Sequence, residues 1–319
     1  MDFQILISNL TNPTLLFFVL GIVATLLKSD LEIPSTTSKF ITLYLFFSIG
    51  FRGGQELAHS GINMEILYSL IFAMVISALI PLYTYYILRR KLSVSDSGAI
   101  AAAYGSVSAV TFVAAVSFLE AQQINFGGHM VAVMALMESP AIIIGVILIM
   151  QYERSSSQAK LGEVLKHSIT NSSVLMILGS LVIGLIADTK QAAGITPFTT
   201  DIFKGFLAIF LLEMGMITAR RFAAFRKQGW FAFLFAIVIP MINGCLVGWL
   251  TGYFITSPGN RFIFAVLAAS ASYIAVPAAM RLAAPKADPG LYIPMAIGVT
   301  FPFNITIGMP LYLLIVEMT

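Results

Sequence analysis

Two stretches of the chain, half a sequence apart, carry the same pattern of small residues. Ala102–Val110 reads AAYGSVSAV, and Ala268–Val276 reads AASASYIAV, at an offset of 166 positions. Two shorter pairs match at nearly the same offset, 165 and 162 respectively: Leu45–Gly50 (LFFSIG) with Phe210–Gly215 (FLLEMG), and Glu138–Pro140 (ESP) with Thr300–Pro302 (TFP). Near-constant offsets at three places indicate that the second half of the chain is a copy of the first.

The composition of the chain is that of a membrane protein. Of its 319 residues, 58% are hydrophobic and 10% are charged, against about 45–50% and about 25% in soluble globular domains. A helix needs about 20 residues to cross the hydrocarbon layer, and at that length the chain has ten candidate spans. The first five are residues 12–28, 38–56, 64–88, 96–120 and 129–150, and the second five are residues 168–188, 201–220, 229–255, 260–283 and 290–316.

Each copy of the repeat holds five spans, an odd number, so the two copies have opposite orientations in the membrane. The sequence therefore predicts an all-α membrane protein of ten transmembrane helices, arranged as a 5+5 inverted repeat. Its parts are a first repeat at residues 1–150, a linker at 151–167 and a second repeat at 168–319. The second span weakens after Gly50, so we expect its end to be unwound or to lie at the membrane interface. Inverted repeats are a recurrent architecture of secondary transporters, and the pattern favours that class.

The distribution of Lys and Arg predicts which side of the membrane each loop faces. All of them except Arg52, Lys190, Lys204 and Arg261 fall in or beside the connections that follow odd-numbered spans, and basic loops stay in the cytoplasm. Both termini are then extracytoplasmic, and the polar linker 151–167 is cytoplasmic, as a plain linker or as the docking site of a regulator. Basic residues spread over short loops, with a net charge of +3, argue against nucleic acid as a partner.

Spans four and nine carry the residue types expected of a substrate site near the middle of the membrane. Both contain small and hydroxyl-bearing residues at equivalent places, and Pro277 disfavours an unbroken ninth helix. We expect both crossing helices to be discontinuous, so that two half-helix N-termini offer free amides and partial positive charge to a small anion. Hydroxyl groups would complete its hydrogen bonds: Ser106, Ser108, Ser270 and Ser272. The alternative is plain helix packing, in which small residues let helices approach and each serine bonds to its own helix.

Two acidic residues lie inside the predicted spans, Glu138 and Glu213. A carboxylate near the bilayer centre costs at least about 2.5–3.5 kcal/mol, so acids at that depth usually serve a function. Glu138 precedes Pro140, which leaves a carbonyl one turn back without its donor, and a carboxylate with freed carbonyls suits a hard cation such as Na⁺. Thr300 and Asn304 are the polar counterparts in the second half. The alternatives are a structural Glu138, protonated or paired with Arg, and a Glu213 that reaches toward a cytoplasmic vestibule.

The residue pattern does not favour catalysis. His59, His129 and His167 are scattered along the chain, Cys245 is the single cysteine, and no phosphate loop of the Walker type occurs. The sequence therefore predicts that the protein is not an enzyme and that it uses no organic cofactor and no metal other than sodium. Transport would draw on an ion gradient.

Two second-half motifs resemble a known family. Ala269–Arg281 (ASASYIAVPAAMR) and Val299–Gly308 (VTFPFNITIG) are similar to the sodium-dependent bicarbonate transporter family of cyanobacteria and other bacteria, and Met1–Phe3 and Asn12–Leu15 also look like that family. The resemblance implies a sodium:bicarbonate symporter that takes HCO₃⁻ into the cell across the bacterial inner membrane. It further implies a homotrimer, control by a PII-like cytoplasmic protein, and an elevator-like movement of spans 3–5 and 8–10, the core, against spans 1, 2, 6 and 7, the scaffold.

The resemblance also implies which residues bind the two ions. The anion site falls on eight positions: Gly105, Ser106, Val107, Ser108, Ser270, Ala271, Ser272 and Tyr273. The sodium site falls on Ser108, Thr111 and Glu138, to which the reasoning above adds Thr300 and Asn304. Where the family tends to carry Gly and then Ser, this chain has Ala109 and Val110, which affects the affinity or the choice of anion. The linker 151–167 is short for the family, which weakens the expectation of a regulator.

A second hypothesis keeps the fold and changes the substrate. It is a small organic anion coupled to sodium or protons, as in the bile-acid and sodium:proton transporter relatives of similar architecture. A channel or a purely structural membrane protein is a more distant interpretation.

Overall fold

The computed structural model describes residues 11–60, 63–152, 172–225 and 229–319, and the single positions 162, 166 and 170. Every regular element in these ranges is a helix, which agrees with the predicted all-α class. The helices of the first half are α2 (Pro13–Leu26), α3 (Ser35–Ser60), α4 (Met64–Leu88), α5 (Val94–Gly105), α6 (Ala109–Ala121) and α7 (His129–Tyr152). Most of the predicted linker 151–167, with His167, lies outside the described residues.

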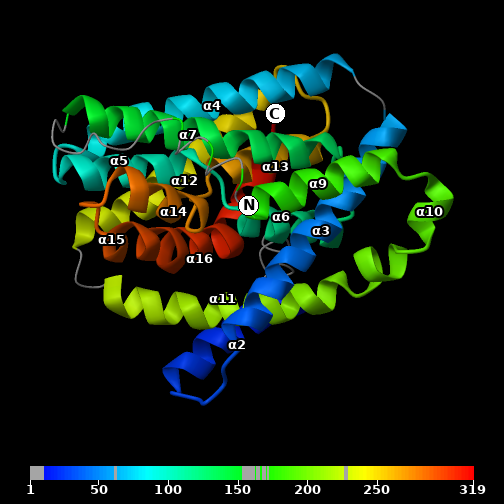
Figure 1. The fold of residues 1–319 in the computed structure, drawn as a ribbon, viewed down its shortest axis with the longest axis horizontal. Coiled ribbons are helices and arrows are strands. Elements are labelled where there is room, and N and C mark those ends of the chain that lie inside the picture. The colour runs from blue at the N-terminus through cyan, green and yellow to red at the C-terminus, as the bar shows by residue number, and fades with distance from the viewer. Residues whose placement is uncertain are drawn as a thin grey trace.

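The second half begins with α9 (Ser172–Ile186) and the short α10 (Thr189–Ala193). It continues with η1 (Pro197–Asp201), α11 (Phe203–Phe225), α12 (Trp230–Thr251), α13 (Pro258–Ala268) and α14 (Ala275–Ala283). The last segment winds without a break through α15 (Pro289–Pro294), η2 (Met295–Thr300), α16 (Phe301–Phe303), η3 (Asn304–Gly308) and α17 (Met309–Glu317). Figure 1 shows α4, α7 and α11 along the longest axis of the molecule, with α3 running obliquely to them.

Six helical stretches among the described residues are long and apolar enough to cross a membrane: Met64–Leu88, Val94–Ala121, His129–Tyr152, Pro197–Phe222, Trp230–Thr251 and Pro289–Glu317. Two shorter apolar helices, α2 and α9, accompany them. The chain is therefore a multi-pass membrane protein. The count of ten spans and the inverted arrangement of the halves stay predictions.

Glycines bring two pairs of helices into backbone contact. A Cβ atom at Gly215 of α11 would lie 2.0 Å from the Phe18 carbonyl oxygen of α2, and one at Gly50 of α3 would lie 2.5 Å from the Ile177 carbonyl oxygen of α9. Such approach is possible only without a side chain, and it is a common way to pack helices in membranes. The structure therefore holds α2 against α11 and α3 against α9.

The end of α3 differs from its prediction. Of the two alternatives for this end, unwinding after Gly50 is wrong, because α3 stays helical to Ser60. A position at the membrane interface stays a prediction. The glycines that lower the helix tendency of this span lie where α3 contacts α7 and α9. A Cβ at Gly54 would lie 2.1 Å from the Leu181 carbonyl oxygen, and one at Gly53 would lie 2.6 Å from the Val131 side chain. The helix tolerates these glycines because neighbouring helices fill the space beside them.

The remaining long helices form two groups of contacts, one in each half of the chain. In the first half α4, α5 and α7 contact one another, and in the second half α12, α13 and α17 do so. Contacts of α13 with α6, and of α14 with α5, join the two groups. The broken segments α5–α6 and α13–α14 therefore lie at the centre of this part of the molecule. We call the helices from α4 to α7 and from α12 to α17 the broken-helix group.

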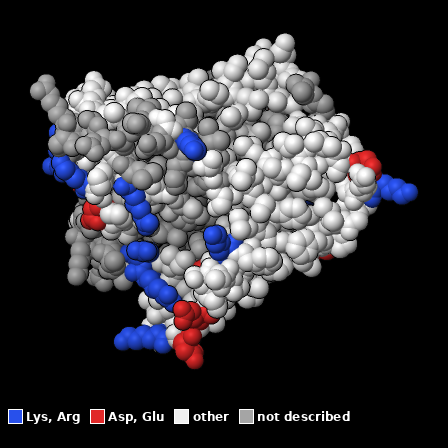
Figure 2. All heavy atoms as spheres, viewed as in Figure 1, with Lys and Arg blue, Asp and Glu red and all other residues white. Residues whose placement is uncertain are grey.

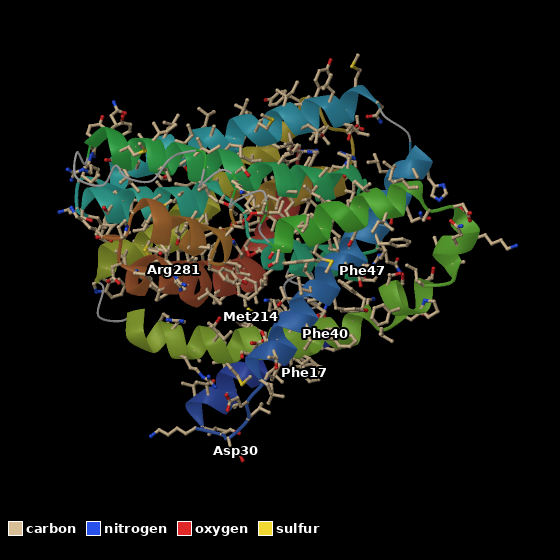
Figure 3. All side chains as sticks on the ribbon, viewed as in Figure 1. Phe17, Asp30, Phe40, Phe47, Met214 and Arg281 are labelled. Atoms are coloured by element: carbon tan, nitrogen blue, oxygen red, sulfur yellow. The ribbon has the colours of Figure 1, made fainter. Side chains whose placement is uncertain are left out.

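The surface agrees with a position in lipid. Figure 2 shows Lys and Arg gathered toward one end of the face in view, with a broad area that carries no charge. Large apolar side chains are exposed along α4, among them Leu67, Ile71 and Leu79. Phe17 and Phe40 are exposed on the side built by α2, α3 and α11 (Figure 3). Exposing so many large apolar side chains to water is unfavourable, whereas exposing them to the hydrocarbon layer of a membrane is not.

Candidate functional site

Both segments that carry the repeated small-residue pattern are interrupted. The first helix of one pair, α5, ends at Gly105 and α6 begins at Ala109, while α13 ends at Ala268 and α14 begins at Ala275. Ser106 and Ser108 have extended backbone angles, and Pro277 occupies the first turn of α14, where its missing N–H costs little. The interruptions thus fall at the predicted residues.

The two interruptions are hydrogen-bonded to each other. The Ser272 N–H donates to the Ala103 carbonyl oxygen at 2.8 Å, and the Ser108 N–H donates to the Ser270 Oγ at 3.0 Å. Ser270 in turn donates to the Leu267 carbonyl at 2.8 Å. Each half of the chain therefore supplies partners for backbone groups that the break in the other half would leave unpaired.

The N-termini of α6 and α14 line one small cavity of about 20 Å³. Its wall comes from the two breaks, from α7, and from α3 and α9: Phe46, Val107, Ser108, Ala109, Glu138, Ser173, Ser272, Tyr273, Ile274 and Ala275. The first amides of a helix have no carbonyl one turn back to bond with, so both helix starts offer N–H groups and partial positive charge. In this state the cavity has room for a water-sized occupant, and a larger anion requires its walls to move apart.

Ser106 is the predicted anion ligand with the clearest unmet bonding capacity. Its side chain is almost fully buried, at 1% exposure, and its Oγ has no hydrogen-bond partner among the described residues. Buried hydroxyl groups are normally paired. Gly105, at the end of α5, and Ser106, Ser270 and Ala271, in the breaks, lie outside the cavity wall, whereas Val107, Ser108, Ser272 and Tyr273 form part of it.

Glu138 of α7 lies in the cavity wall and is 7% exposed. No Lys or Arg in the described ranges forms an ion pair with it, so the interpretation as an Arg-paired structural acid has no support. Pro140 lies two residues later inside α7, and the Ser77 hydroxyl donates to the Met137 carbonyl one position before Glu138. Ser77 and Met137 lie outside the cavity lining, and at the wall itself the Glu138 carboxylate is accompanied by Ser108 and Ser272. Carboxylate and hydroxyl oxygens are donors that suit a sodium ion.

The other predicted sodium ligands, Thr111, Thr300 and Asn304, are not among the residues that line the cavity. The Thr111 N–H donates to the Ser108 Oγ at 3.1 Å, which caps α6. Thr300 bonds to the Tyr104 hydroxyl and donates to the Ala236 carbonyl, each at 2.7 Å. Asn304 donates to the Ala269 carbonyl at 2.7 Å. Their direct role in binding sodium stays a prediction, and what the structure gives them is a supporting role.

We expect Asn304→Ala to lower the stability of the protein by about 2–4 kcal/mol, because it removes both hydrogen bonds of a buried amide side chain. The Asn304 Oδ1 accepts from the Tyr312 hydroxyl at 2.9 Å, and its amide holds the Ala269 carbonyl. Thermal unfolding in detergent measures the loss. Tyr312→Phe is the matched control and should cost clearly less, since it removes only one of the two Asn304 bonds, together with a long 3.4 Å bond from the Tyr312 hydroxyl to the Pro240 carbonyl. Equal losses would contradict this account.

Some wall residues were not predicted. Phe46, Ser173 and Ile274 complete the cavity. Phe46 falls within the repeated stretch Leu45–Gly50, a signal that could have found it, but Ser173 stands in an ordinary apolar helix and gives none. The Tyr273 hydroxyl, 3.7 Å from the Met214 Sδ, adds a contact to α11. Side chains of α3, α9 and α11 thus close the site from the side opposite the breaks.

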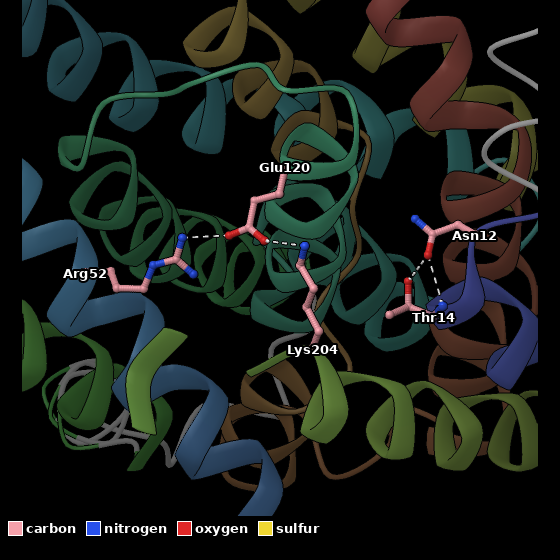
Figure 4. Close-up of polar contacts among 5 residues, drawn as sticks. All are labelled: Asn12, Thr14, Arg52, Glu120 and Lys204. Atoms are coloured by element: carbon pink, nitrogen blue, oxygen red, sulfur yellow. Dashed lines mark hydrogen bonds and ion pairs between the residues drawn. The ribbon is translucent and has the colours of Figure 1, made fainter. Parts of the chain in front are cut away.

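A second, larger cavity of about 700 Å³ lies at the far end of α6. We call it the vestibule. It is a different place from the cytoplasmic vestibule considered for Glu213, which is not in its lining. Its lining includes Arg52, Glu120 and Lys204, and Figure 4 shows the Glu120 carboxylate between the two cationic side chains. The sequence had marked Arg52 and Lys204 only as exceptions to the charge pattern of the loops.

Comparison with known proteins assigns the chain to a family. A search among curated proteins finds no match. A family model described as the Na⁺-dependent bicarbonate transporter superfamily matches residues 13–317. Because that match covers nearly the whole chain and confirms the resemblance found in its motifs, the chain belongs to the Na⁺-dependent bicarbonate transporter superfamily.

Proposed function

We propose that this protein is a sodium-coupled symporter that takes bicarbonate into the cell. The superfamily is one of transporters that depend on Na⁺. The observation that carries the proposal is the convergence of two helix N-termini, those of α6 and α14, on one cavity that also exposes Glu138. An anion and a cation would then be bound side by side.

The electrostatics of that cavity suggest how the two ions are coupled. The amides of α6 and α14 attract an anion, but the Glu138 carboxylate repels it. Two charges about 4 Å apart interact by about 4 kcal/mol at an effective dielectric constant of 20. A sodium ion held by Glu138 and the Ser108 hydroxyl would cancel this repulsion, so each ion would raise the affinity for the other. Coupling of this kind favours symport.

Packing supports an inverted repeat of ten helices. Gly50 and Gly215 are equivalent positions of the two halves, and each contacts the first helix of the other half. The breaks also fall at equivalent positions. We infer a scaffold of α2, α3, α9 and α11, with the broken-helix group as the moving core. The cavity lies between them, with Phe46 of α3 and Ser173 of α9 in its wall, and its small volume is why we expect elevator-like movement of one group past the other.

The remaining proposals come from the family resemblance. We infer that the protein resides in the bacterial inner membrane and that it forms a homotrimer. The proposal that both termini lie outside rests instead on the distribution of Lys and Arg among the loops. A PII-like cytoplasmic regulator is a further candidate partner, whose site would be the linker 151–167.

Uptake of labelled bicarbonate into proteoliposomes tests the proposed function. We expect an inward sodium gradient to drive accumulation, whereas an equal potassium gradient should not. Bicarbonate uptake at the same rate with and without a sodium gradient would contradict the proposed coupling to sodium. A proton gradient imposed without sodium distinguishes the alternative of proton coupling.

The alternative of a small organic anion is supported by one wall residue. Ala109 places a methyl group at the cavity, where the resemblance leads us to expect glycine. Formate and acetate, added in excess, measure this preference. We expect bicarbonate uptake to be reduced less by either acid than by unlabelled bicarbonate; stronger competition by the organic anions would favour them as substrates.

A further inference from the structure

One carboxylate at the end of α6 contacts cationic side chains of two other helices. The Glu120 Oε1 lies 2.7 Å from the Arg52 Nη2 of α3, and its Oε2 lies 3.8 Å from the Lys204 Nζ of α11 (Figure 4). These are the two ion pairs in the described part of the chain. Neither pair lies within one helix, so both fix the position of α6 relative to its neighbours.

The three helices belong to two packing groups: α3 and α11 are scaffold helices, and α6 is part of the broken-helix group. Backbone contacts at glycines hold α3 to α9 and α11 to α2, whereas α6 contacts α13 in the broken-helix group. Arg52 is also held toward α11, because its guanidinium lies 5.8 Å from the centre of the Phe203 ring, a favourable cation–π arrangement. The cluster therefore joins the two groups.

Helix α6 connects this cluster to the ion site. Its first residues line the small cavity, and Glu120 lies in its last turn at the vestibule. Twelve residues at 1.5 Å per residue place Glu120 about 18 Å from Ser108 along the helix axis. The cluster is therefore too distant to touch the bound ions, but it acts on the helix whose N-terminus would bind them.

We propose that Arg52, Glu120 and Lys204 form an ion-pair latch that holds α6 against α3 and α11 and so stabilises this state of the transport cycle. Glu120 is then a positioning residue. The proposal rests on the proposed function, since a latch requires two groups that move relative to each other. The side chains are partly exposed, at 34%, 22% and 64% for Arg52, Glu120 and Lys204. Partly exposed pairs are weak, which suits a contact that must break in every cycle.

A cysteine reporter tests the latch without any substrate. Cys245 is the single cysteine, so Cys245→Ser gives a background free of thiols. Val116→Cys then places a thiol on α6, at a buried residue that lines the vestibule. In proteoliposomes, we expect Glu120→Gln to raise the rate of maleimide labelling at this thiol by about threefold, the scale set by an ion pair of this exposure. Arg52→Gln should act in the same direction.

Two controls separate a latch from a general change of charge. Glu56→Gln removes a negative charge from the same vestibule, and Glu56 has no ion pair with the described residues. This substitution should therefore leave the labelling rate of the thiol at position 116 at the parent value. Exchanging all three charges, with Arg52→Glu, Glu120→Arg and Lys204→Glu together, should restore slow labelling, because both ion pairs are then rebuilt with reversed sign. Equal rates in Glu120→Gln and Glu56→Gln, or failure of the exchange to restore slow labelling, would overturn the latch.

Uptake kinetics give a second, independent readout. We expect Glu120→Gln to change the maximal rate of bicarbonate uptake by about threefold and to leave the KM for bicarbonate within about twofold, because Glu120 lies outside the ion site. A changed KM at constant maximal rate would contradict the positioning role. The labelling experiment needs no transported ion, so it distinguishes failure of the latch from failure of the proposed function.

Discussion

Glu138→Gln is expected to lower the sodium affinity of uptake by more than about tenfold while the protein stays folded. The substitution keeps the size of the side chain and removes the charge that would hold the cation, an interaction of several kcal/mol at short range. Sodium dependence of labelled bicarbonate uptake measures the change. Size-exclusion chromatography in detergent checks that the variant is folded.

The same substitution gives a sharper test through binding. With the carboxylate gone, nothing at the cavity opposes an anion, so bicarbonate should bind the variant without sodium. Ligands raise the thermal stability of the state that binds them. We therefore expect bicarbonate to stabilise the parent protein only when sodium is present, and to stabilise Glu138→Gln equally with and without it.

Glu213→Gln is the matched control. Glu213 is also a buried acid with an unpaired oxygen, Oε2, in the described structure, but it lies on α11 outside the cavity wall. Its variant should keep the parent's sodium affinity. An unchanged sodium affinity in Glu138→Gln, or an equal loss in both variants, would show that Glu138 is not the sodium ligand.

Gly215→Ala is expected to destabilise the protein by about 3 kcal/mol or more. The new methyl carbon would lie 2.0 Å from the Phe18 carbonyl oxygen, a distance at which backbone must move, and overpacking of this kind is costly. A fall of about 5 °C or more in the thermal midpoint in detergent would record it.

Gly205→Ala in the same helix supplies the comparison. A Cβ at Gly205 would have no neighbour within 4 Å, and alanine favours a helix over glycine by about 1 kcal/mol. Gly205→Ala should therefore be neutral or slightly stabilising. If the two alanine variants unfold alike, the close approach of α2 and α11 is not what holds this pair together.

Composition and periodicity were sufficient to predict the helical class and the positions of the two breaks. The breaks were predictable because Gly105 and Pro277 disfavour a continuous helix and because the pattern around them occurs twice. The cavity wall was only partly predictable. Ser173 reaches it through the packing of α9 against α3, which no local pattern encodes. Thr300 and Asn304 were assigned to the sodium site by residue type, and Thr111 by the family resemblance. That role stays a prediction, and the hydrogen bonds of these residues go to Ser108, Ala236 and Ala269.

The glycine-rich end of α3 shows the limit of local propensity. Gly50, Gly53 and Gly54 reduce the intrinsic tendency to form a helix, and unwinding was one of the two alternatives that the sequence left open for this end. Tertiary contacts overrode that tendency, because the space left by each missing side chain is occupied by α7 or α9.

The hydrogen bonds between the two breaks have a consequence for biosynthesis. The first break is made and inserted long before its partners Ser270 and Ser272 exist, about 160 residues later in the chain. At roughly 5–20 residues per second, that interval is about 8–30 s. During this time the Ala103 carbonyl and the Ser108 N–H lack the partners they have in the finished protein, and the membrane core supplies none. The first half must therefore wait at the insertion machinery, or keep water at its break, until the second half arrives.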